Sequence, residues 1–207
     1  MYFIGILNFM DDSSATWRQY YEKSLLRPHN SRTEIAIELN QSGLQTAVDC
    51  GCGTGSEIAY LEQQGYQVFG FDINPDSVAI CSERFSSKPL VKLSECSFES
   101  FKYPSAGIVI ANSSLFFADP LEFKNTWRKI ASSIAVGGVF VGDFMGPRDS
   151  WATNYRLPTA PLSKKQVELL FKEFEIVSFK ERDEPGATRI GYPKHWHIFS
   201  VIAVKRT

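Results

Sequence analysis

The feature that most constrains this sequence is a glycine-rich stretch directly after a short apolar run. The run is Thr46-Ala47-Val48-Asp49-Cys50, and glycine then occupies positions 51, 53 and 55. Glycine lets a backbone turn sharply, and it lets a ligand approach without a Cβ in the way. A helix that starts after such a loop points its free N–H groups at the loop. The stretch therefore predicts a strand–loop–helix unit that can hold a polar group.

The rest of the chain alternates between short apolar runs and segments of helical periodicity. Strands are expected at residues 46–50, 66–71, 90–93, 107–111, 139–144, 174–179 and 196–204. Helices are expected at residues 14–26, 32–41, 57–64, from Pro75 onward, at 121–135 and at 164–171. Gly137-Gly138 is expected to end the helix over 121–135. Strands that alternate with helices and are continuously apolar indicate a parallel sheet covered on both faces, and right-handed crossovers make it doubly wound.

The last two expected strands are joined differently from the others. Residues 180–195 show no helical periodicity and contain Pro185, Gly186, Gly191 and Pro193. A connection without a crossover helix favours an antiparallel pair. The chain of 207 residues also fits one domain. The predicted fold is thus a single α/β domain with a seven-stranded, mostly parallel, Rossmann-like sheet, an antiparallel last strand and helices on both faces.

The second expected strand ends at an acidic residue, Asp72. An acid at that place can accept hydrogen bonds from both hydroxyls of a ribose. The ligand would lie beyond the carboxyl ends of the strands, at the switch point of the strand order. Loop and acid together predict a nucleoside-binding site. The alternative is a tight strand–helix turn with an unrelated surface aspartate.

Residues 48–55 and Gly70-Phe71-Asp72-Ile73 resemble the first two motifs of class I S-adenosylmethionine-dependent methyltransferases. The resemblance spans residues 47–144. It extends weakly into the tail, which resembles the broad small-molecule group that contains tellurite-resistance enzymes. A dinucleotide-binding loop would read GxGxxG, but Ser56 stands where the third glycine belongs. The resemblance implies S-adenosylmethionine as cofactor, with Asp49 organising the loop near the methionine ammonium.

The resemblance also implies which residues touch the cofactor. They are Trp17, Tyr21, Asp49, Gly51, Cys52, Gly53, Gly55, Asp72, Ile73, Glu95, Cys96 and Asn112. Glu95 departs from the aspartate that is frequent in the adenine-binding segment, so a solvated glutamate is its alternative. Trp17 and Tyr21 lie on a segment that resembles a lid helix, although a plain amphipathic helix fits equally. The domain then divides into a helical lid at 1–43, a cofactor core at 44–144 and a substrate-side tail at 145–207.

A small-molecule acceptor is expected rather than nucleic acid. The formal net charge is -1, so no overall field attracts nucleic acid. The Asn-Pro-Pro-aromatic motif of nucleic-acid amino methylation is also missing after the fourth strand. Arg148 and Arg189 are candidates to hold an anionic acceptor, with surface ion pairs as the alternative.

Two histidines at the start of the last strand are candidate general bases. His195 and His197 alternate, so both point to one side of a strand, and an antiparallel last strand begins at the carboxyl rim of the sheet. The alternative is that the pair only flanks Trp196. A metal site with Asp143 or Asp183 is the less favoured reading, and no metal is expected.

Two other functions share this pattern: a nicotinamide-dependent oxidoreductase and a non-catalytic S-adenosylmethionine-binding regulatory module. The four cysteines include no CxxC pair, so reduced thiols are expected rather than zinc. The apolar residues 1–7 are short and lack a basic leader, so neither a signal peptide nor a membrane span is expected. These observations favour the cytoplasm. The oligomeric state cannot be read from the sequence.

Overall fold

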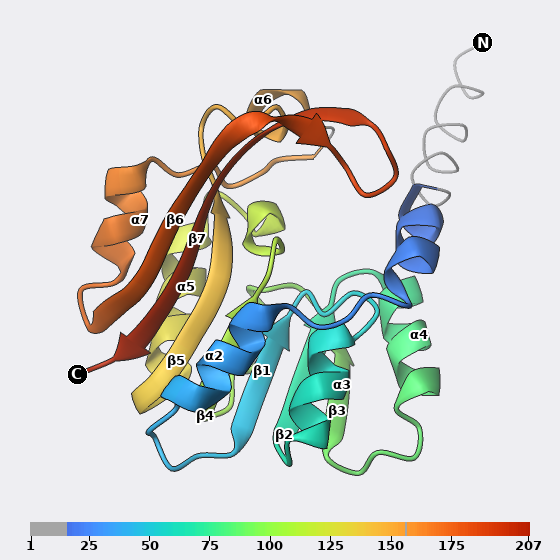
Figure 1. Ribbon diagram of the computed structural model, residues 1–207, viewed down its shortest axis with the longest axis vertical. Coiled ribbons are helices and arrows are strands. Elements are labelled where there is room, and N and C mark those ends of the chain that lie inside the picture. Colours follow the sequence, from blue (N-terminus) through green and yellow to red (C-terminus); the bar gives the residue numbers. More distant parts are fainter. Residues whose placement is uncertain (1–15, 156) are drawn as a thin grey trace.

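One seven-stranded sheet runs through the described part of the computed structural model, which comprises residues 16–155 and 157–207 (Figure 1). Its strands are β1 (Thr46–Cys50), β2 (Gln67–Asp72), β3 (Val91–Glu95), β4 (Ala106–Ala111), β5 (Ile134–Met145), β6 (Phe174–Ala187) and β7 (Pro193–Lys205). The order is β3-β2-β1-β4-β5-β7-β6. Strands β1 to β5 pair in parallel, and β7 is antiparallel to both β5 and β6. The predicted fold class and the antiparallel last strand are confirmed.

Helices cover both faces of the sheet. They are α2 (Ser31–Leu39), α3 (Ser56–Gln63), α4 (Pro75–Arg84), α5 (Phe123–Ser133), α6 (Trp151–Asn154) and α7 (Lys164–Leu170), with a short 3-10 turn η1 (Leu115–Phe117). Residues 16–24 are also helical, and the predicted cap at Ser13 or Ser14 lies outside the described residues, as do residues 1–7. Helices α2, α3 and α4 lie on one face, and α5 and α7 lie on the other (Figure 1).

Side chains alternate along the strands and therefore form two hydrophobic cores, one on each face of the sheet. On the α5 side, Trp127 packs edge-on against Phe140 at 5.0 Å and against Phe171 at 4.9 Å between ring centroids. On the α2 side, Ile108 and Val141 are fully buried. This two-sided burial explains why the central strands read as unbroken apolar runs rather than as alternating ones.

Two segments differ from the sequence prediction. Helix α5 ends at Ser133, and β5 begins at once with Ile134, which pairs with Ala106. Gly137 therefore does not end a helix; it lies inside β5 at a register shift, with φ +80°. The helical prediction for residues 134 and 135 was wrong because pairing with β4 decided the conformation there.

The β6–β7 hairpin is also longer than predicted. Both strands continue into residues 180–195, and the turn lies between Thr188 and Tyr192, whose backbones are hydrogen-bonded. Strand β6 is an edge strand with mostly exposed residues, so it needed no apolar periodicity. The hairpin rises past the other strands and curves toward the amino-terminal helix (Figure 1). Within the described residues, no helix is both long and apolar enough to span a bilayer.

The aromatic core on the α5 side should dominate stability. Phe140 is fully buried, so Phe140→Ala should lower the free energy of unfolding by about 3–5 kcal/mol through lost contacts and a cavity. Leu121→Ala, at a side chain that is 92% exposed, should change it by less than about 0.5 kcal/mol. Urea denaturation of the three proteins measures both values. Equal midpoints for the two variants would contradict the assigned core.

Candidate functional site

The glycine loop lies at the carboxyl end of β1, beside the switch point between β1 and β4. Gly51, Gly53 and Gly55 have φ values of 68°, 54° and 77°, a region that favours glycine. A Cβ on Gly51 would lie 2.6 Å from Ser114 Cβ, and one on Gly55 would lie 2.6 Å from the Phe85 ring. A Cβ on Gly53 would meet no atom within 4 Å. The middle of the loop thus borders open space, while its two ends are packed.

The loop is held in place by hydrogen bonds from α4. The Gly53 carbonyl accepts from Ser77 Oγ at 2.6 Å and from Cys81 Sγ at 3.2 Å, and Arg84 donates to the Thr54 carbonyl. Cys52 is buried, and its hydrogen bond with Cys81, followed by burial, raises the pKa of its thiol. The Cys52 thiol therefore stays protonated and acts in packing rather than as a nucleophile.

Asp72 lies at the end of β2, next to this loop. Its carboxylate accepts hydrogen bonds from the backbone N–H of Gly53 and of Asn74, each at 3.0 Å. Glu95 pairs with Asp72 in the β2–β3 register, and the Cys96 backbone N–H donates to the Asp72 carbonyl. Ile73 leaves 71% of its side chain exposed. The structure therefore brings all four of these predicted contacts to one rim.

Asp49 is a buried charge without a full set of partners. Only 3% of the residue is exposed, and among the described residues its Oδ2 has no hydrogen-bond partner. Burial, followed by repulsion from Glu57, raises the pKa of Asp49 well above its ordinary value. An unpaired buried carboxylate oxygen costs free energy in the isolated protein, and a bound ammonium group would compensate it.

A buried ion pair lies on the other side of the loop and was missed in the sequence. Arg32, in α2, grips both carboxylate oxygens of Asp143 at 2.8 Å and donates to Asn112 Oδ1 at 2.8 Å. Ser113, with φ 53°, and Ser200 also donate to Asp143. Asn112 Nδ2 is buried and unpaired among the described residues. No sequence signal links Arg32 to Asp143, because the two residues are far apart in the chain.

The amino-terminal helix contacts the glycine loop through Ser24 and carries Tyr21 beside it. Tyr21 is buried and stacks on Trp17 at 5.8 Å, and burial, followed by the Asp72 charge, raises the pKa of its phenol. The Thr54 hydroxyl donates to the Ser24 carbonyl. These contacts place the helix against the cofactor loop, as the lid prediction requires, whereas opening and closing stay a prediction.

The two candidate histidines lie on the face of β7 that contacts the α5 side. His197 is buried beside Phe199 at 4.9 Å, and its Nδ1 accepts from the Arg148 backbone N–H at 3.0 Å. Its Nε2 lies 3.1 Å from Glu181 Oε1, and His195 Nε2 lies 2.8 Å from Asp183. Alternation sends Trp196 and Ile198 to the opposite face, toward Met145. The structure does not bring the histidines to the glycine loop, and their role as bases stays a prediction.

The two candidate arginines contact other parts of the protein. Arg148 lies 2.6 Å from Asp183 and 3.3 Å from Glu181, and it lowers the pKa of Asp183 to about 2, with help from His195. Glu181, Asp183 and His197 hold possible metal-ligating atoms within 4.8 Å of one another, and Arg148 forms an ion pair with each of the two carboxylates. Arg189 donates to the Lys23 carbonyl at 3.5 Å, which joins the hairpin turn to the amino-terminal helix.

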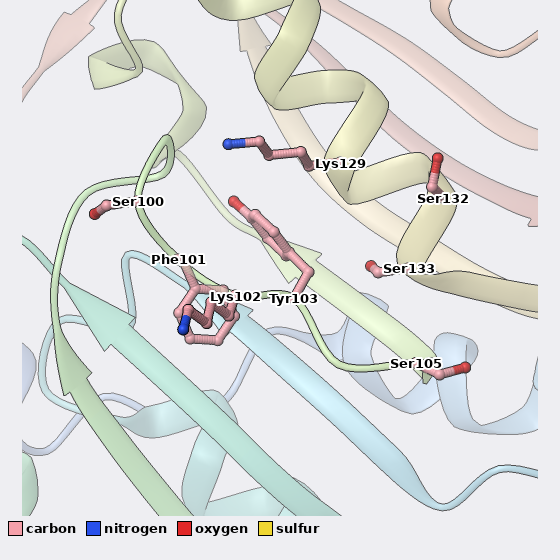
Figure 2. A pocket seen from close by; sticks show the side chains of 8 residues that line it. All are labelled: Ser100, Phe101, Lys102, Tyr103, Ser105, Lys129, Ser132 and Ser133. Carbon is pink, nitrogen blue, oxygen red and sulfur yellow. The ribbon is translucent and has the colours of Figure 1, made fainter.

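A separate hollow lies between the β3–β4 connection and α5 (Figure 2). Lys129 and Tyr103 both extend toward the loop that carries Ser100, where they donate to the backbone carbonyls of Glu99 and Phe98 respectively. It contains no residue predicted for the site. Its polar ends are already paired, so it does not compete with the glycine loop as the functional site.

Together, the doubly wound sheet, the glycine loop and the acid at the next strand define a nucleoside-binding protein of the class I methyltransferase fold. Residues 48–142 match the family model described as a methyltransferase domain. This stretch, a little under half of the chain, is therefore identified as a methyltransferase domain, and the match supports S-adenosylmethionine, the predicted cofactor. A comparison with curated proteins finds no match in sequence.

Solved structures share this fold. TehB from Haemophilus influenzae superposes with a TM-score of 0.69 at 16% identity, over 86% of this chain and 63% of TehB. A SAM-dependent methyltransferase from Methanosarcina mazei gives 0.63 at 19% identity, over 83% of this chain and 97% of that one. The 1,6-didemethyltoxoflavin-N1-methyltransferase of Burkholderia thailandensis gives 0.65 at 15% identity, over 97% and 86%. At these identities the likeness establishes the fold, and the chain spans less than two thirds of TehB.

The unpaired Asp49 leads to a prediction about pH. Because its pKa is raised in the fold, the protonated form is favoured, and stability present below the ordinary aspartate pKa is lost as pH rises through the raised value. Asp49→Asn should therefore stabilise the cofactor-free protein at pH 7 by about 1–3 kcal/mol. The gain should shrink toward pH 4.

Thermal melts at the two pH values measure this difference. Glu38→Gln, at an exposed position of α2, serves as the control and should shift neither melt. A cofactor-free Asp49→Asn protein that is less stable than the wild type at pH 7 would contradict the assignment.

Proposed function

We propose that this protein transfers the methyl group of S-adenosylmethionine to a small-molecule acceptor. The observation that carries the proposal is the buried Oδ2 of Asp49, which has no partner among the described residues, on the strand next to that of Asp72. The same strand leads into the loop where Gly53 borders open space. A carboxylate buried this way suits the ammonium group of a methionine moiety. The Burkholderia thailandensis structure of the same fold contains 1,6-didemethyltoxoflavin and S-adenosylhomocysteine, which supports a small acceptor here.

Each predicted contact has a distinct part in holding the cofactor. The Asp72 carboxylate would accept the ribose hydroxyls, and the Gly51–Gly55 backbone would leave room for the chain that bears the sulfur. Asp49 would face the ammonium group, and the unpaired amide of Asn112 would donate to the carboxylate. The adenine would lie by exposed Ile73, with Glu95 and Cys96 at its edge.

When bound, the cofactor supplies a methyl group activated by a sulfonium. The chain's own residues then have to align an acceptor and exclude water, a proximity effect worth several kcal/mol. Tyr21 and Trp17 cover the loop from the amino-terminal side. Arg32 neutralises Asp143 and fixes the Asn112 amide. A base is needed only where the acceptor atom must lose a proton.

Two alternatives are separable by experiment. A nicotinamide-dependent oxidoreductase would share the sheet and Asp72, but Ser56 opens α3 where the third glycine would stand. Fluorescence titration with reduced dinucleotide tests this alternative, and a silent titration removes it. A regulatory module would bind cofactor without consuming it.

We further propose a cytoplasmic location, which the four free cysteines support.

The cofactor assignment predicts a loss of binding in two loop variants. Asp72→Ala removes the ribose acceptor, and Gly53→Val fills the open side of the loop with a side chain in a left-handed backbone. Each should weaken S-adenosylmethionine at least tenfold in titration calorimetry, which corresponds to about 1.4 kcal/mol.

A matched control is available for the glycine. Gly65 also has positive φ and open space at its Cβ position, but it follows α3 at the far end from the loop. Gly65→Val imposes the same strain and should leave the affinity within threefold. Wild-type affinity in both Asp72→Ala and Gly53→Val would refute the site.

The histidines allow a test of the base prediction. Each ring contacts a carboxylate, His197 that of Glu181 and His195 that of Asp183. If a histidine is the base, His195→Ala or His197→Gln should lower turnover a hundredfold or more and leave cofactor affinity within threefold. Turnover within threefold of the wild type in both variants would exclude the pair as bases.

A further inference from the structure

Five aromatic side chains form a continuous patch beyond the carboxyl ends of β4, β5 and the start of β7. This aromatic rim consists of Trp17, Phe117, Trp151, Tyr155 and Trp196. Their ring centroids lie 5.1 to 6.2 Å apart in successive contacts. Every one of the five retains exposed surface. Aromatic surface of this extent, gathered from four separate segments, is unusual on a protein face without a ligand to cover it.

The aromatic rim adjoins the cofactor loop. Trp17 stacks on Tyr21, whose phenol pKa is raised by burial and then by the charge of Asp72. Phe117 belongs to η1, which follows Asn112 after two residues, and Ser114 between them donates to the Cys50 carbonyl. The rim thus begins at the cofactor loop and extends to Trp196 on the hairpin. This is where an acceptor has to lie if the proposed function holds.

The ammonium group of a buried lysine already lies over two indole rings of the aromatic rim. Lys194 Nζ lies 3.9 Å from the ring centroid of Trp151 and 4.5 Å from that of Trp196. Its side chain is 1% exposed and forms an ion pair with Asp149, which is 0% exposed. Burial lowers the pKa of Lys194, and the Asp149 carboxylate opposes that shift. The cation–π capacity of these two rings is therefore used by the protein itself, and a second cation there would be repelled.

We propose that the aromatic rim is the acceptor site and that it binds a planar aromatic molecule that is neutral or anionic. This inference rests on the proposed function, which supplies the need for an acceptor at this rim. Ring-to-ring contacts favour a flat π system beyond the area they bury, so two contacts discriminate about tenfold or more against a saturated analogue. Lys194 supplies the discrimination against cations.

Three probes of similar size separate shape from charge. They are 2-naphthol, which is planar and neutral, its saturated analogue decahydro-2-naphthol, and the cation N-methylquinolinium. Each is titrated by calorimetry into the full chain saturated with S-adenosylhomocysteine. We expect 2-naphthol to bind at least tenfold more tightly than either of the other two. Equal affinity for decahydro-2-naphthol would overturn the planar specificity, and equal affinity for N-methylquinolinium would overturn the charge specificity.

Variants then assign the binding to the rim. Trp151→Leu and Trp196→Leu retain apolar volume but remove the indole faces, so each should weaken 2-naphthol at least fivefold. Both should bind S-adenosylhomocysteine within threefold of the wild type, which shows that they are folded. Tyr192→Ala, an exposed aromatic at the hairpin turn, is the control and should change neither affinity. Unchanged 2-naphthol binding in both Trp variants would overturn the site.

The charge argument has an inverse test. Lys194→Met with Asp149→Asn removes the buried pair without leaving either charge unpaired. N-methylquinolinium should gain at least tenfold in affinity, because the indole faces become available to an added cation; no gain would overturn the role of Lys194. Failure of S-adenosylhomocysteine to bind the wild type would instead refute the proposed function. Cofactor binding without any 2-naphthol binding would refute only the acceptor class.

Discussion

The geometry at the carboxyl ends of the parallel strands depends on one buried ion pair, between Arg32 and Asp143. The carboxyl ends of parallel strands all meet at one edge, so the polar groups that end them are crowded into a small, partly dry volume. Arg32 comes from α2 and neutralises the acid that ends β5 in a two-pronged contact. The same guanidinium holds Asn112, and the same carboxylate holds Ser113 in its left-handed backbone. The Arg32–Asp143 ion pair therefore fixes the carboxyl ends of β4 and β5 and the position of α2 relative to them.

Asp49, near the carboxyl end of β1, lacks a partner of this kind. It is as buried as Asp143, but no arginine reaches it and one oxygen has no partner among the described residues. A ligand group that pairs with Asp49 gains more than a fixed partner could give to binding. Pairing recovers the free energy that the unpaired carboxylate oxygen costs the isolated protein. The satisfied acid on β5 and the unsatisfied acid on β1 are two positions apart in the sheet order, and this difference separates the scaffold from the proposed binding site without reference to any relative.

The sequence predicted the sheet and the cofactor loop well, and for the same reason: both depend on local pattern. β1 matched its prediction residue for residue, and Asp72, Ile73 and Glu95 gather at one rim because parallel register demands it. Arg32 was missed because its partner lies on a distant strand. The length of β6 was missed because an exposed edge strand of alternating charges carries no apolar signal. Helix α6, of four residues, is too short for any periodicity.

The alternation of side chains along β7 shows that a local sequence pattern predicts which residues share a face of a strand but leaves open which face that is. Placing the start of an antiparallel last strand at the carboxyl rim was sound, and so was placing His195 and His197 on one side of it. Which side could not be known, because the face is set by the register with β5, where Met145 pairs with Ile198. That register directs Trp196 toward Trp151 and the aromatic rim, and directs His197 beneath Arg148 and Glu181. Trp196, between the two histidines, therefore faces the aromatic rim that we propose as the acceptor site, and the role of the histidines as bases stays a prediction.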